Sequence, residues 1–222
     1  MICAAIFDID GTLVDSVDLH ARAWREAFLH FGKNVPLQDV HAQMGKGGDQ
    51  LLPVFFSEAE LSRFGKELEA YRGAIYQRDY LPQVRALPGI RPLFEKISGD
   101  GIAIGLASSA KADEVAVYKR LAQIDDLVQS ETSADDVQRS KPYPDIFQAA
   151  LAAMGHPDVA SVMVVGDTPY DAQAAGKIGL PTIGVLSGGF PADWLKTSGC
   201  IAIYADAADL LAHYPQSPFA AP

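Results

Sequence analysis

Short apolar runs alternate with helix-like stretches from about residue 85 onward. The apolar runs predict strands at 102–107, 126–129, 161–166, 181–186 and 201–204, in addition to a first strand at 2–7. Helices are expected between these strands, near 90–98, 111–122, 144–154, 170–177 and 206–213. Such alternation is typical of a parallel sheet with helices on both faces, so the sequence predicts an α/β core with a Rossmann-like sheet.

Residues 16–84 interrupt this alternation. They contain no convincing strand, but His20, Trp24, Phe28 and Phe31 recur at helical spacing. We therefore expect an α-helical cap domain over 16–84, inserted into a core domain formed by 1–15 and 85–222. The hinges between them are expected near 14–17 and 81–88, and the tail 217–222 is expected to fray.

Composition and charge exclude several classes of partner. Hydrophobic residues make up 49% of the 222 residues and charged residues 21%, as in ordinary globular proteins. The net charge of −10 argues against nucleic acid and against anionic membranes, which bind basic surfaces. No apolar run approaches the ~20 residues that span a bilayer, and the N-terminus lacks the basic region of a signal peptide. The two cysteines, Cys3 and Cys200, indicate reduced thiols and a cytoplasmic setting.

Two carboxylates follow the first predicted strand. Asp8 and Asp10 lie two residues apart just after the strand, so their side chains should share a direction, although Gly11 is expected to bend the chain. Two crowded carboxylates are costly unless a cation neutralises them or one of them holds a proton. The pair therefore predicts a Mg²⁺ site with a nucleophile and an acid/base, or else an acidic turn ended by Gly11 and Thr12.

Polar residues also follow two later strands. Ser108 comes after the strand at 102–107, and Asp167 comes after the strand at 161–166. Ligands of parallel α/β sheets bind beyond the carboxyl ends of the strands. Asp8, Ser108 and Asp167 are therefore expected to meet in one site. An acidic protein that handles an anionic ligand must supply local positive charge, which draws attention to Lys141.

Four segments of the chain together resemble motifs I to IV of the haloacid dehalogenase superfamily of phosphotransferases. They begin with Asp8-Ile9-Asp10-Gly11-Thr12 and Ala107-Ser108-Ser109, and continue with Ser140-Lys141-Pro142 and Gly166-Asp167-Thr168-Pro169-Tyr170-Asp171. The resemblance implies that Asp8 is a nucleophile that forms an aspartyl-phosphate, and that Asp10 is first a general acid and then a general base. It also implies that Mg²⁺ is bound by Asp8, Asp167 and the backbone carbonyl of Asp10.

The same resemblance assigns the neighbouring polar residues. Ser108 and the backbone at Ser109 would bind the phosphate. The alternative for Ser108 is simple capping of the following helix, although Ser109 is the better cap. Lys141 would contact both Asp8 and the phosphate. Asp171 would bind the metal through water or orient Lys141, or it would only place a negative charge at a helix N-terminus.

The predicted cap contains two further candidates. The stretch Gly45-Lys46-Gly47-Gly48-Asp49 resembles the substrate-specificity loop of family members with a helical cap, in which Lys46 and Gly47 would contact the leaving group. A plain connecting loop is the alternative. His20 matches a hinge-side histidine of β-phosphoglucomutase-like members, but its spacing from Trp24 also permits a packed core histidine.

The resemblance implies a Mg²⁺-dependent phosphomonoesterase of the phosphoglycolate phosphatase and β-phosphoglucomutase branch, acting on a small phosphorylated metabolite. A sugar phosphate mutase is the alternative, although Gly47 and Gly48 stand where we would expect an arginine for a second phosphate. Asp10 disfavours a 2-haloacid dehalogenase, which does not need it. A catalytically silent metabolite-binding protein is a further alternative, but it would be expected to lack some of Asp8, Asp10, Lys141 and Asp167, and all four are present. We expect a monomer or a weak homodimer.

Overall fold

A central parallel sheet organises the computed structural model, which describes residues 1–220. The strands are β1 (Ala4–Phe7), β4 (Ala103–Ala107), β5 (Ser130–Thr132), β6 (Val162–Gly166), β7 (Thr182–Val185) and β8 (Cys200–Tyr204). Their order in the sheet is β5-β4-β1-β6-β7-β8, and every neighbouring pair is parallel. The predicted α/β class is therefore confirmed.

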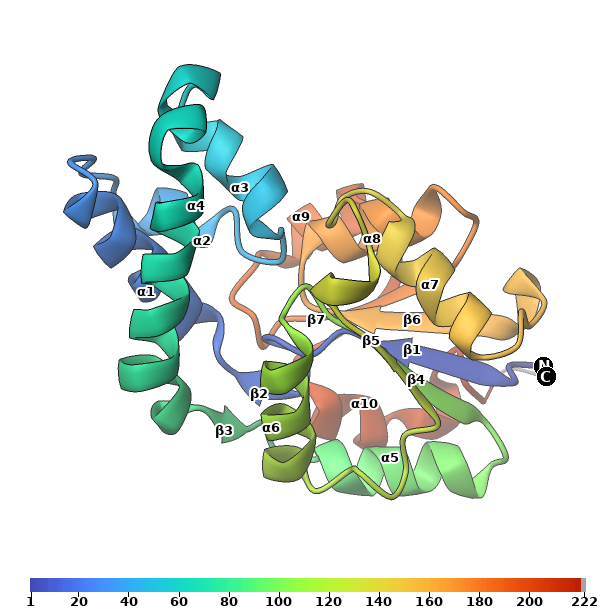
Figure 1. Cartoon of the computed structure of the whole chain (residues 1–222). Helices are drawn as coiled ribbons and strands as arrows, with labels where there is room; N and C mark the ends of the chain where they lie inside the picture. Colours follow the sequence, from blue (N-terminus) through green and yellow to red (C-terminus); the bar gives the residue numbers. More distant parts are fainter. Residues whose placement is uncertain (221–222) are drawn as a thin grey trace.

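Helices cover both faces of this sheet (Figure 1). One face packs on α5 (Ile90–Gly99), α6 (Ala112–Ala122) and α10 (Ala207–Ala212), and the other on α7 (Asp145–Ala153) and α8 (Pro169–Gly176). Alternate residues of β1 serve the two layers, because successive strand side chains point to opposite faces: Phe7 packs with the first layer and Ile6 with the second. The sheet is thus buried on both sides, as its apolar strands require.

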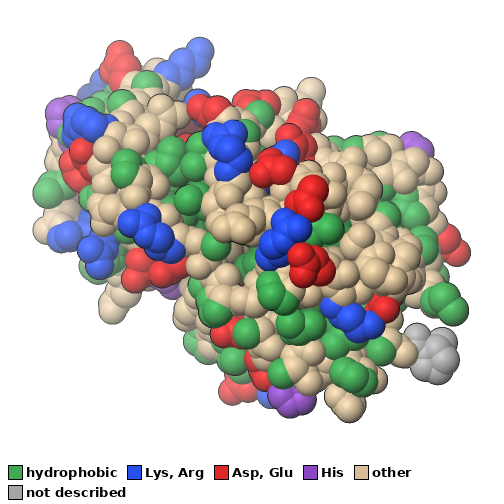
Figure 2. Space-filling model, turned by 90° about the horizontal axis from the view of Figure 1, so that it is seen from below, with side chains coloured by type: hydrophobic (Ala, Val, Ile, Leu, Met, Phe, Trp, Pro, Cys, Tyr) green, Lys and Arg blue, Asp and Glu red, His purple; other side chains and the backbone are tan. Residues whose placement is uncertain are grey.

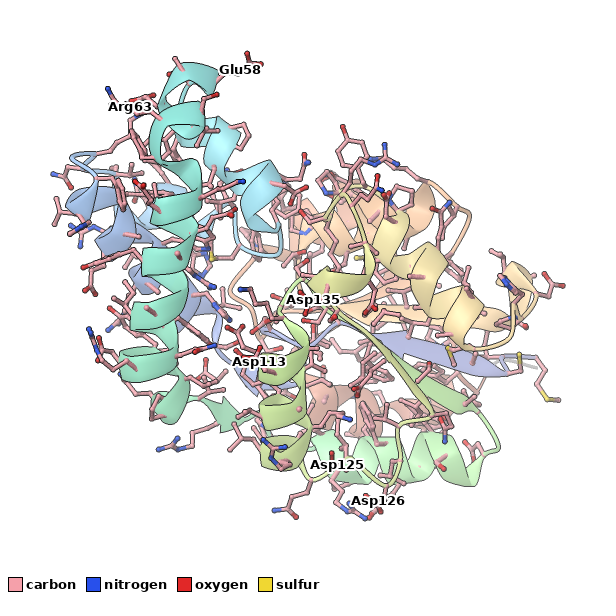
Figure 3. All side chains as sticks on the ribbon, in the orientation of Figure 1. Glu58, Arg63, Asp113, Asp125, Asp126 and Asp135 are labelled. Atoms are coloured by element: carbon pink, nitrogen blue, oxygen red, sulfur yellow. The ribbon has the colours of Figure 1, made fainter. Side chains whose placement is uncertain are left out.

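Four helices form a separate body between β1 and α5. They are α1 (Val17–His30), α2 (Leu37–His41), α3 (Gly48–Phe55) and α4 (Glu58–Ile75). Trp24, Phe28 and Leu68 belong to their own hydrophobic core. A capping box of Ser57 and Glu60 begins α4, and Glu58 and Arg63 mark this N-terminal end of the helix in Figure 3.

The chain enters and leaves this helical body through one small ribbon. Strand β2 (Val14–Asp15) pairs antiparallel with β3 (Arg85–Ala86), close to where the hinges are expected. Before β3, a π-helical turn (Tyr76–Tyr80) and a 3₁₀ turn (Leu81–Gln83) continue from α4. The two crossing points are therefore held side by side by backbone hydrogen bonds.

Two local expectations are wrong, and one helix was not predicted. Residues 126–129 do not form the edge strand; the chain turns there, with Leu127 N–H donating to the Ile124 carbonyl, and the strand follows at 130–132. The helix α9 (Ala192–Thr197) lies in a stretch that the pattern left unassigned. Phe219 is buried and stacks on Tyr214, so the described part of the tail does not fray. Residues 221 and 222 of that tail lie outside the described part.

Surface charges are mixed in sign. On the face shown in Figure 2, Lys and Arg side chains lie beside Asp and Glu side chains, with hydrophobic side chains scattered among them. Arg91, for example, pairs with Glu95 at 2.9 Å and with Asp126 at 2.8 Å. Among residues 1–220, no helix combines the length and apolar character needed to cross a membrane.

Candidate active site

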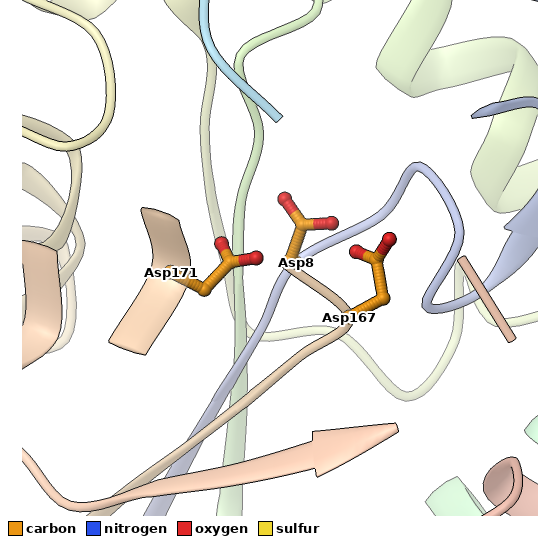
Figure 4. A group of neighbouring side chains, drawn as sticks. All are labelled: Asp8, Asp167 and Asp171. Carbon is orange, nitrogen blue, oxygen red and sulfur yellow. The ribbon is translucent and has the colours of Figure 1, made fainter. Parts of the chain in front are cut away.

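Three carboxylates meet at the carboxyl ends of β1 and β6 (Figure 4). Phe7 pairs with Val165, so Asp8 and Asp167 leave neighbouring strands at nearly the same level. Asp171 approaches from the first turn of α8. One oxygen from each of the three carboxylates lies within 4.8 Å of the others, and all three residues are buried. The structure thus brings together Asp8 of the first motif with Asp167 and Asp171 of the last.

Lys141 supplies the positive charge of this group. Its side chain is 0% exposed, and Nζ lies 2.5 Å from Asp8 Oδ1 and 2.7 Å from Asp171 Oδ1. Nζ also donates to the Ala107 carbonyl at 3.1 Å. Burial alone would lower the pKa of Lys141, but Asp171 and Asp8 raise it above its ordinary value. Lys141 is therefore a fixed cation held between two carboxylates.

One ammonium does not balance three buried carboxylates. Asp167 Oδ1 accepts from Thr12 Oγ1 at 3.2 Å, but the buried Oδ2 has no hydrogen-bond partner among residues 1–220. Burial, together with Asp8 and Asp171, raises the pKa of Asp167 well above its ordinary value. Burial also raises the pKa of Asp8, to about 7. An orphaned oxygen in an all-oxygen, electronegative site fits a hard divalent cation such as Mg²⁺.

The Asp10 side chain belongs to a different set of contacts. Its Oδ1 accepts from Ser16 Oγ at 2.5 Å and from His20 Nε2 at 2.8 Å. Burial alone would raise the pKa of Asp10, but His20 and Ser16 outweigh it and lower this pKa below its ordinary value. The two motif carboxylates thus have opposite environments. Asp8 is crowded by negative charge, and Asp10 is supported by donors.

His20 is both buried and attached to Asp10. Its Nδ1 contacts the Arg72 guanidinium, which can only donate, so Nδ1 accepts and Nε2 carries the proton given to Asp10. The imidazole stacks on Tyr76 with ring centroids 4.0 Å apart. Tyr118 Oη lies 3.3 Å from Nε2. His20 can therefore be both a packed core histidine and a hinge-side histidine of the site, because the packing holds the ring that contacts Asp10.

The serines after β4 differ from each other. Ser108 is buried, and its Oγ accepts from Ala110 N–H at 3.0 Å. Ser109 Oγ donates to the Gly45 carbonyl of the helical body at 3.3 Å. The alternative that Ser109 caps the next helix is wrong, because α6 begins at Ala112 and Lys111 occupies the N-cap position. Ser109 instead contacts the loop opposite it.

Asp171 combines two of the roles considered for it. Its Oδ2 accepts from Thr168 N–H at 3.0 Å and from Thr168 Oγ1 at 2.6 Å, which forms a capping box at the start of α8. Its Oδ1 faces Lys141 at 2.7 Å. The helix terminus therefore fixes a carboxylate that in turn fixes the ammonium.

The glycine-rich loop of the helical body lies against the core. Gly47 N–H donates to Ser140 Oγ at 2.8 Å, and Ser140 Oγ donates to Asp49 Oδ1 at 2.5 Å. Lys46 Nζ donates to Gln43 Oε1 at 2.6 Å and lies 4.5 Å from the centre of the Tyr170 ring. Burial lowers the pKa of Lys46. The loop is therefore docked on the segment that carries Lys141.

The chain matches the profile described as haloacid dehalogenase-like hydrolase over residues 5–185. It belongs to that family. The resemblance seen in the four motifs is confirmed, and so is the prediction that the protein is a hydrolytic enzyme.

Individual relatives of this hydrolase align over most of its length. It is 29% identical over 214 residues to the phosphoglycolate phosphatase of Yersinia pestis, covering 92% of this chain and 90% of the relative. It is 30% identical over 188 residues to Protein SUPPRESSOR OF QUENCHING 1, chloroplastic, of Arabidopsis thaliana. That match covers 83% of this chain but spans only 18% of the plant protein. A solved hydrolase from Pseudomonas syringae superposes with a TM-score of 0.85 at 29% identity, covering 96% of this chain and 98% of the other.

Two adjoining cavities lie between the sheet and the helical body of the hydrolase. The inner one, about 90 Å³, is lined by Asp8, Asp10, His20 and Lys46 among others. The outer one, about 730 Å³, is lined by Ser108, Ser109 and residues of α4 and α6. Seven of the predicted site residues thus line one or both of these cavities, whereas Lys141, Asp167 and Asp171 line neither.

Sequence reasoning missed several residues of this site. Ser16 and Arg72 contact Asp10 and His20, and Tyr118 contacts His20 from α6. Arg72 and Tyr118 lie 52 and 98 residues from His20 in sequence, so no local spacing could pair them with it. Ser16 had a signal, since it sits six residues after Asp10, where the chain must turn into α1.

Proposed function

We propose that this hydrolase is a Mg²⁺-dependent phosphomonoesterase that acts on a small phosphorylated metabolite through an aspartyl-phosphate. The observation that carries the proposal is the setting of Asp8: its buried carboxylate faces the Lys141 ammonium at 2.5 Å and lies in one group with Asp167. Similarity to a phosphoglycolate phosphatase supports phosphate esters as substrates.

Asp8, Asp167 and the backbone carbonyl of Asp10 would hold the magnesium ion. The partnerless Asp167 Oδ2 and the raised pKa values of Asp8 and Asp167 support this assignment. When bound, the ion would offset the repulsion between Asp8 and the phosphate and polarise a phosphate oxygen.

The chain's own residues account for the remaining requirements of phosphoryl transfer. Asp8 attacks phosphorus, and Lys141 neutralises charge on Asp8 and the phosphate. Ser108 and Ser109 bind the phosphate oxygens at the end of β4. Asp171 keeps Lys141 in place.

Asp10 moves the protons. It gives one to the leaving oxygen and later takes one from the attacking water. Its pKa is lowered in the free protein, so it must gain its proton when the doubly charged phosphate arrives, since a nearby negative charge disfavours ionisation. The contacts from Ser16 and His20 aim the carboxylate during both steps.

The helical body would act as a cap domain over 16–84 on a core of 1–15 and 85–222. Its own hydrophobic core and the β2–β3 ribbon support this division. Closure would exclude bulk water from the site, and Lys46 and Gly47 would then lie beside the leaving group.

Two further proposals concern the cellular compartment and the oligomeric state of the enzyme. Cys3 and Cys200 are both free, which supports a reducing, cytoplasmic environment. We propose a monomer or a weak homodimer, which sedimentation at several concentrations would check.

The test is turnover of p-nitrophenyl phosphate and of β-glucose 1-phosphate with Mg²⁺ or with EDTA. We expect inorganic phosphate to be released with Mg²⁺ only. Asp8→Asn should abolish both turnover and acid-stable phosphoenzyme, whereas Asp39→Asn, the same change on an exposed cap residue, should alter neither. Conversion of β-glucose 1-phosphate to glucose 6-phosphate with little free phosphate would instead establish a mutase. Turnover by the Asp8→Asn variant would remove Asp8 as the nucleophile.

A further inference from the structure

Two charged side chains, Arg72 from α4 and Glu114 from α6, line both cavities of the site. The inner cavity of about 90 Å³ has the volume of about three water molecules. A phosphate bound at Asp8 would fill much of that space. A leaving group of more than a few atoms must therefore extend past Arg72 and Glu114 into the outer cavity of about 730 Å³.

Glu114 is a buried acid without a partner. Its residue is 4% exposed, yet its carboxylate makes no hydrogen bond or ion pair with any side chain or backbone group in residues 1–220. Burial raises the pKa of Glu114, against the influence of His20 and Arg72. Buried carboxylates in proteins are nearly always hydrogen-bonded, so this one is positioned to accept from a ligand.

Arg72 lines the same passage as Glu114. Its Nε is buried and donates to nothing among the described residues, so a ligand in the cavity does not reach this nitrogen. The guanidinium is nevertheless held in place, because it contacts His20 and lies over the rings of Trp24 and Tyr76, 4.9 Å and 4.8 Å from their centres. Arg72 thus places a fixed positive charge in the passage that Glu114 also lines.

We propose that Glu114 is a specificity-determining residue that selects substrates with a neutral, hydroxyl-bearing leaving group. A hydroxyl near the phosphate ester donates to the Glu114 carboxylate, which gives this buried acid the partner that it lacks. The inference rests on the proposed phosphatase function and names the substrate class of that site as phosphorylated polyols and sugars.

Leaving groups that carry their own negative charge fit this passage poorly. A carboxylate or second phosphate near the ester would face Glu114 across a buried space and could not donate to it. Arg72 is already shared with His20. Lys46, which lines the inner cavity, already donates to Gln43 Oε1 at 2.6 Å and lies over the Tyr170 ring. The remaining cations that line the outer cavity, Lys66 and Lys111, are exposed, and Asp49 and Glu69 line the same cavity. Phosphoglycolate and pyrophosphate are therefore disfavoured, although relatives of this chain are named for them.

A matched pair of esters tests the inference. 2-Hydroxyethyl phosphate and 2-phosphoglycolate have the same chain length and differ in a terminal CH₂OH or carboxylate. We expect kcat/KM of the wild-type protein to favour 2-hydroxyethyl phosphate by at least about tenfold, the effect of leaving one buried polar group unpaired. Glu114→Gln keeps the size and removes the charge, and it should lower that ratio about tenfold. Glu67→Gln, the same change on an exposed face of α4, should leave the ratio unaltered.

The outcomes separate this inference from the proposed function. A wild-type ratio of one or less overturns the role of Glu114, whatever the stability of the variant. An unchanged ratio in a folded Glu114→Gln protein also overturns it. If p-nitrophenyl phosphate is not hydrolysed with Mg²⁺ by the wild-type protein, the phosphatase proposal itself fails. If p-nitrophenyl phosphate is hydrolysed but 2-hydroxyethyl phosphate is not preferred over 2-phosphoglycolate, the phosphatase proposal stands. Only the proposed substrate class is then refuted.

Discussion

Replacing Lys141 by methionine should cost both stability and activity, and the two losses can be separated. Lys141 is 0% exposed and lies between Asp8 and Asp171, at 2.5 Å and 2.7 Å. Methionine has a similar length and an unbranched side chain, so it fills the space without a charge. The variant leaves two buried carboxylates without their ammonium.

The size of the stability loss follows from the burial of the pair. Removing one partner of a buried ion pair costs about 3–5 kcal/mol, because the remaining charge is uncompensated. For a protein of 222 residues this lowers the melting temperature by about 6–20 °C. Thermal unfolding in EDTA at pH 8 measures it, with Lys196→Met, an exposed lysine of α9, as the control for the substitution.

A second substitution distinguishes charge balance from catalysis. Asp171→Asn added to Lys141→Met removes one of the stranded carboxylates, so the double variant should regain about half or more of the lost stability. Its activity should stay absent, because Asp8 still lacks the ammonium that neutralises it beside a phosphate. A double variant as unstable as Lys141→Met would refute the reasoning, since the loss would then come from packing. Appreciable turnover by either variant would refute the proposed role of Lys141.

Three further outcomes can be measured with the same phosphatase assay. Asp10→Asn should fold normally but lower kcat by ~10²–10⁴-fold, since the amide keeps the contacts and loses proton transfer; a loss below tenfold would contradict this. At limiting Mg²⁺, activity should fall as the pH decreases through about 7, because burial raises the pKa of Asp8 to about 7 and the protonated acid neither attacks nor binds the cation. A flat profile from pH 6 to 8 would contradict it. Ser140→Ala should lower kcat/KM by about fivefold, the effect of a hydrogen bond of about 1 kcal/mol, because the contacts with Gly47 and Asp49 are lost.

The sheet could be predicted because its strands carry their own signal. Each central strand is a run of apolar residues buried on both faces, as in Val162–Gly166. The edge strand Ser130–Thr132 is polar and short, so its pattern is weak, and the apolar Leu127 and Val128 beside it belong to a turn. Leu195 gives α9 one buried apolar position in six residues, too few to show a helical period.

The sequence predicted the candidate site residues that follow strands. It did not predict those that come together only when the helical body packs on the core. Asp8, Ser108 and Asp167 follow strands, so the topology of a parallel sheet places them together. Arg72 and Glu114 come from helices of different bodies, and their approach depends on how the cap sits on the core. No local sequence pattern predicts how close these two side chains lie.

The docked cap and the catalytic groups are linked through residues adjacent to the site. The cap segment 42–49 contacts the core through Ser109, Ser140 and Tyr170, whose hydroxyls meet Gly45, the Gly47–Asp49 stretch and the Ala42 carbonyl. Each of these three core residues is next in sequence to a residue with a proposed role. These neighbours are Ser108, which would bind phosphate, Lys141, which would neutralise charge, and Asp171, which would orient Lys141. A hydrogen bond that holds one residue also restrains the backbone of its neighbour, so the proposed opening of the cap would loosen all three positions together. Full alignment of the proposed catalytic groups would therefore belong to the proposed closed state, in which bulk water would be excluded from an aspartyl-phosphate.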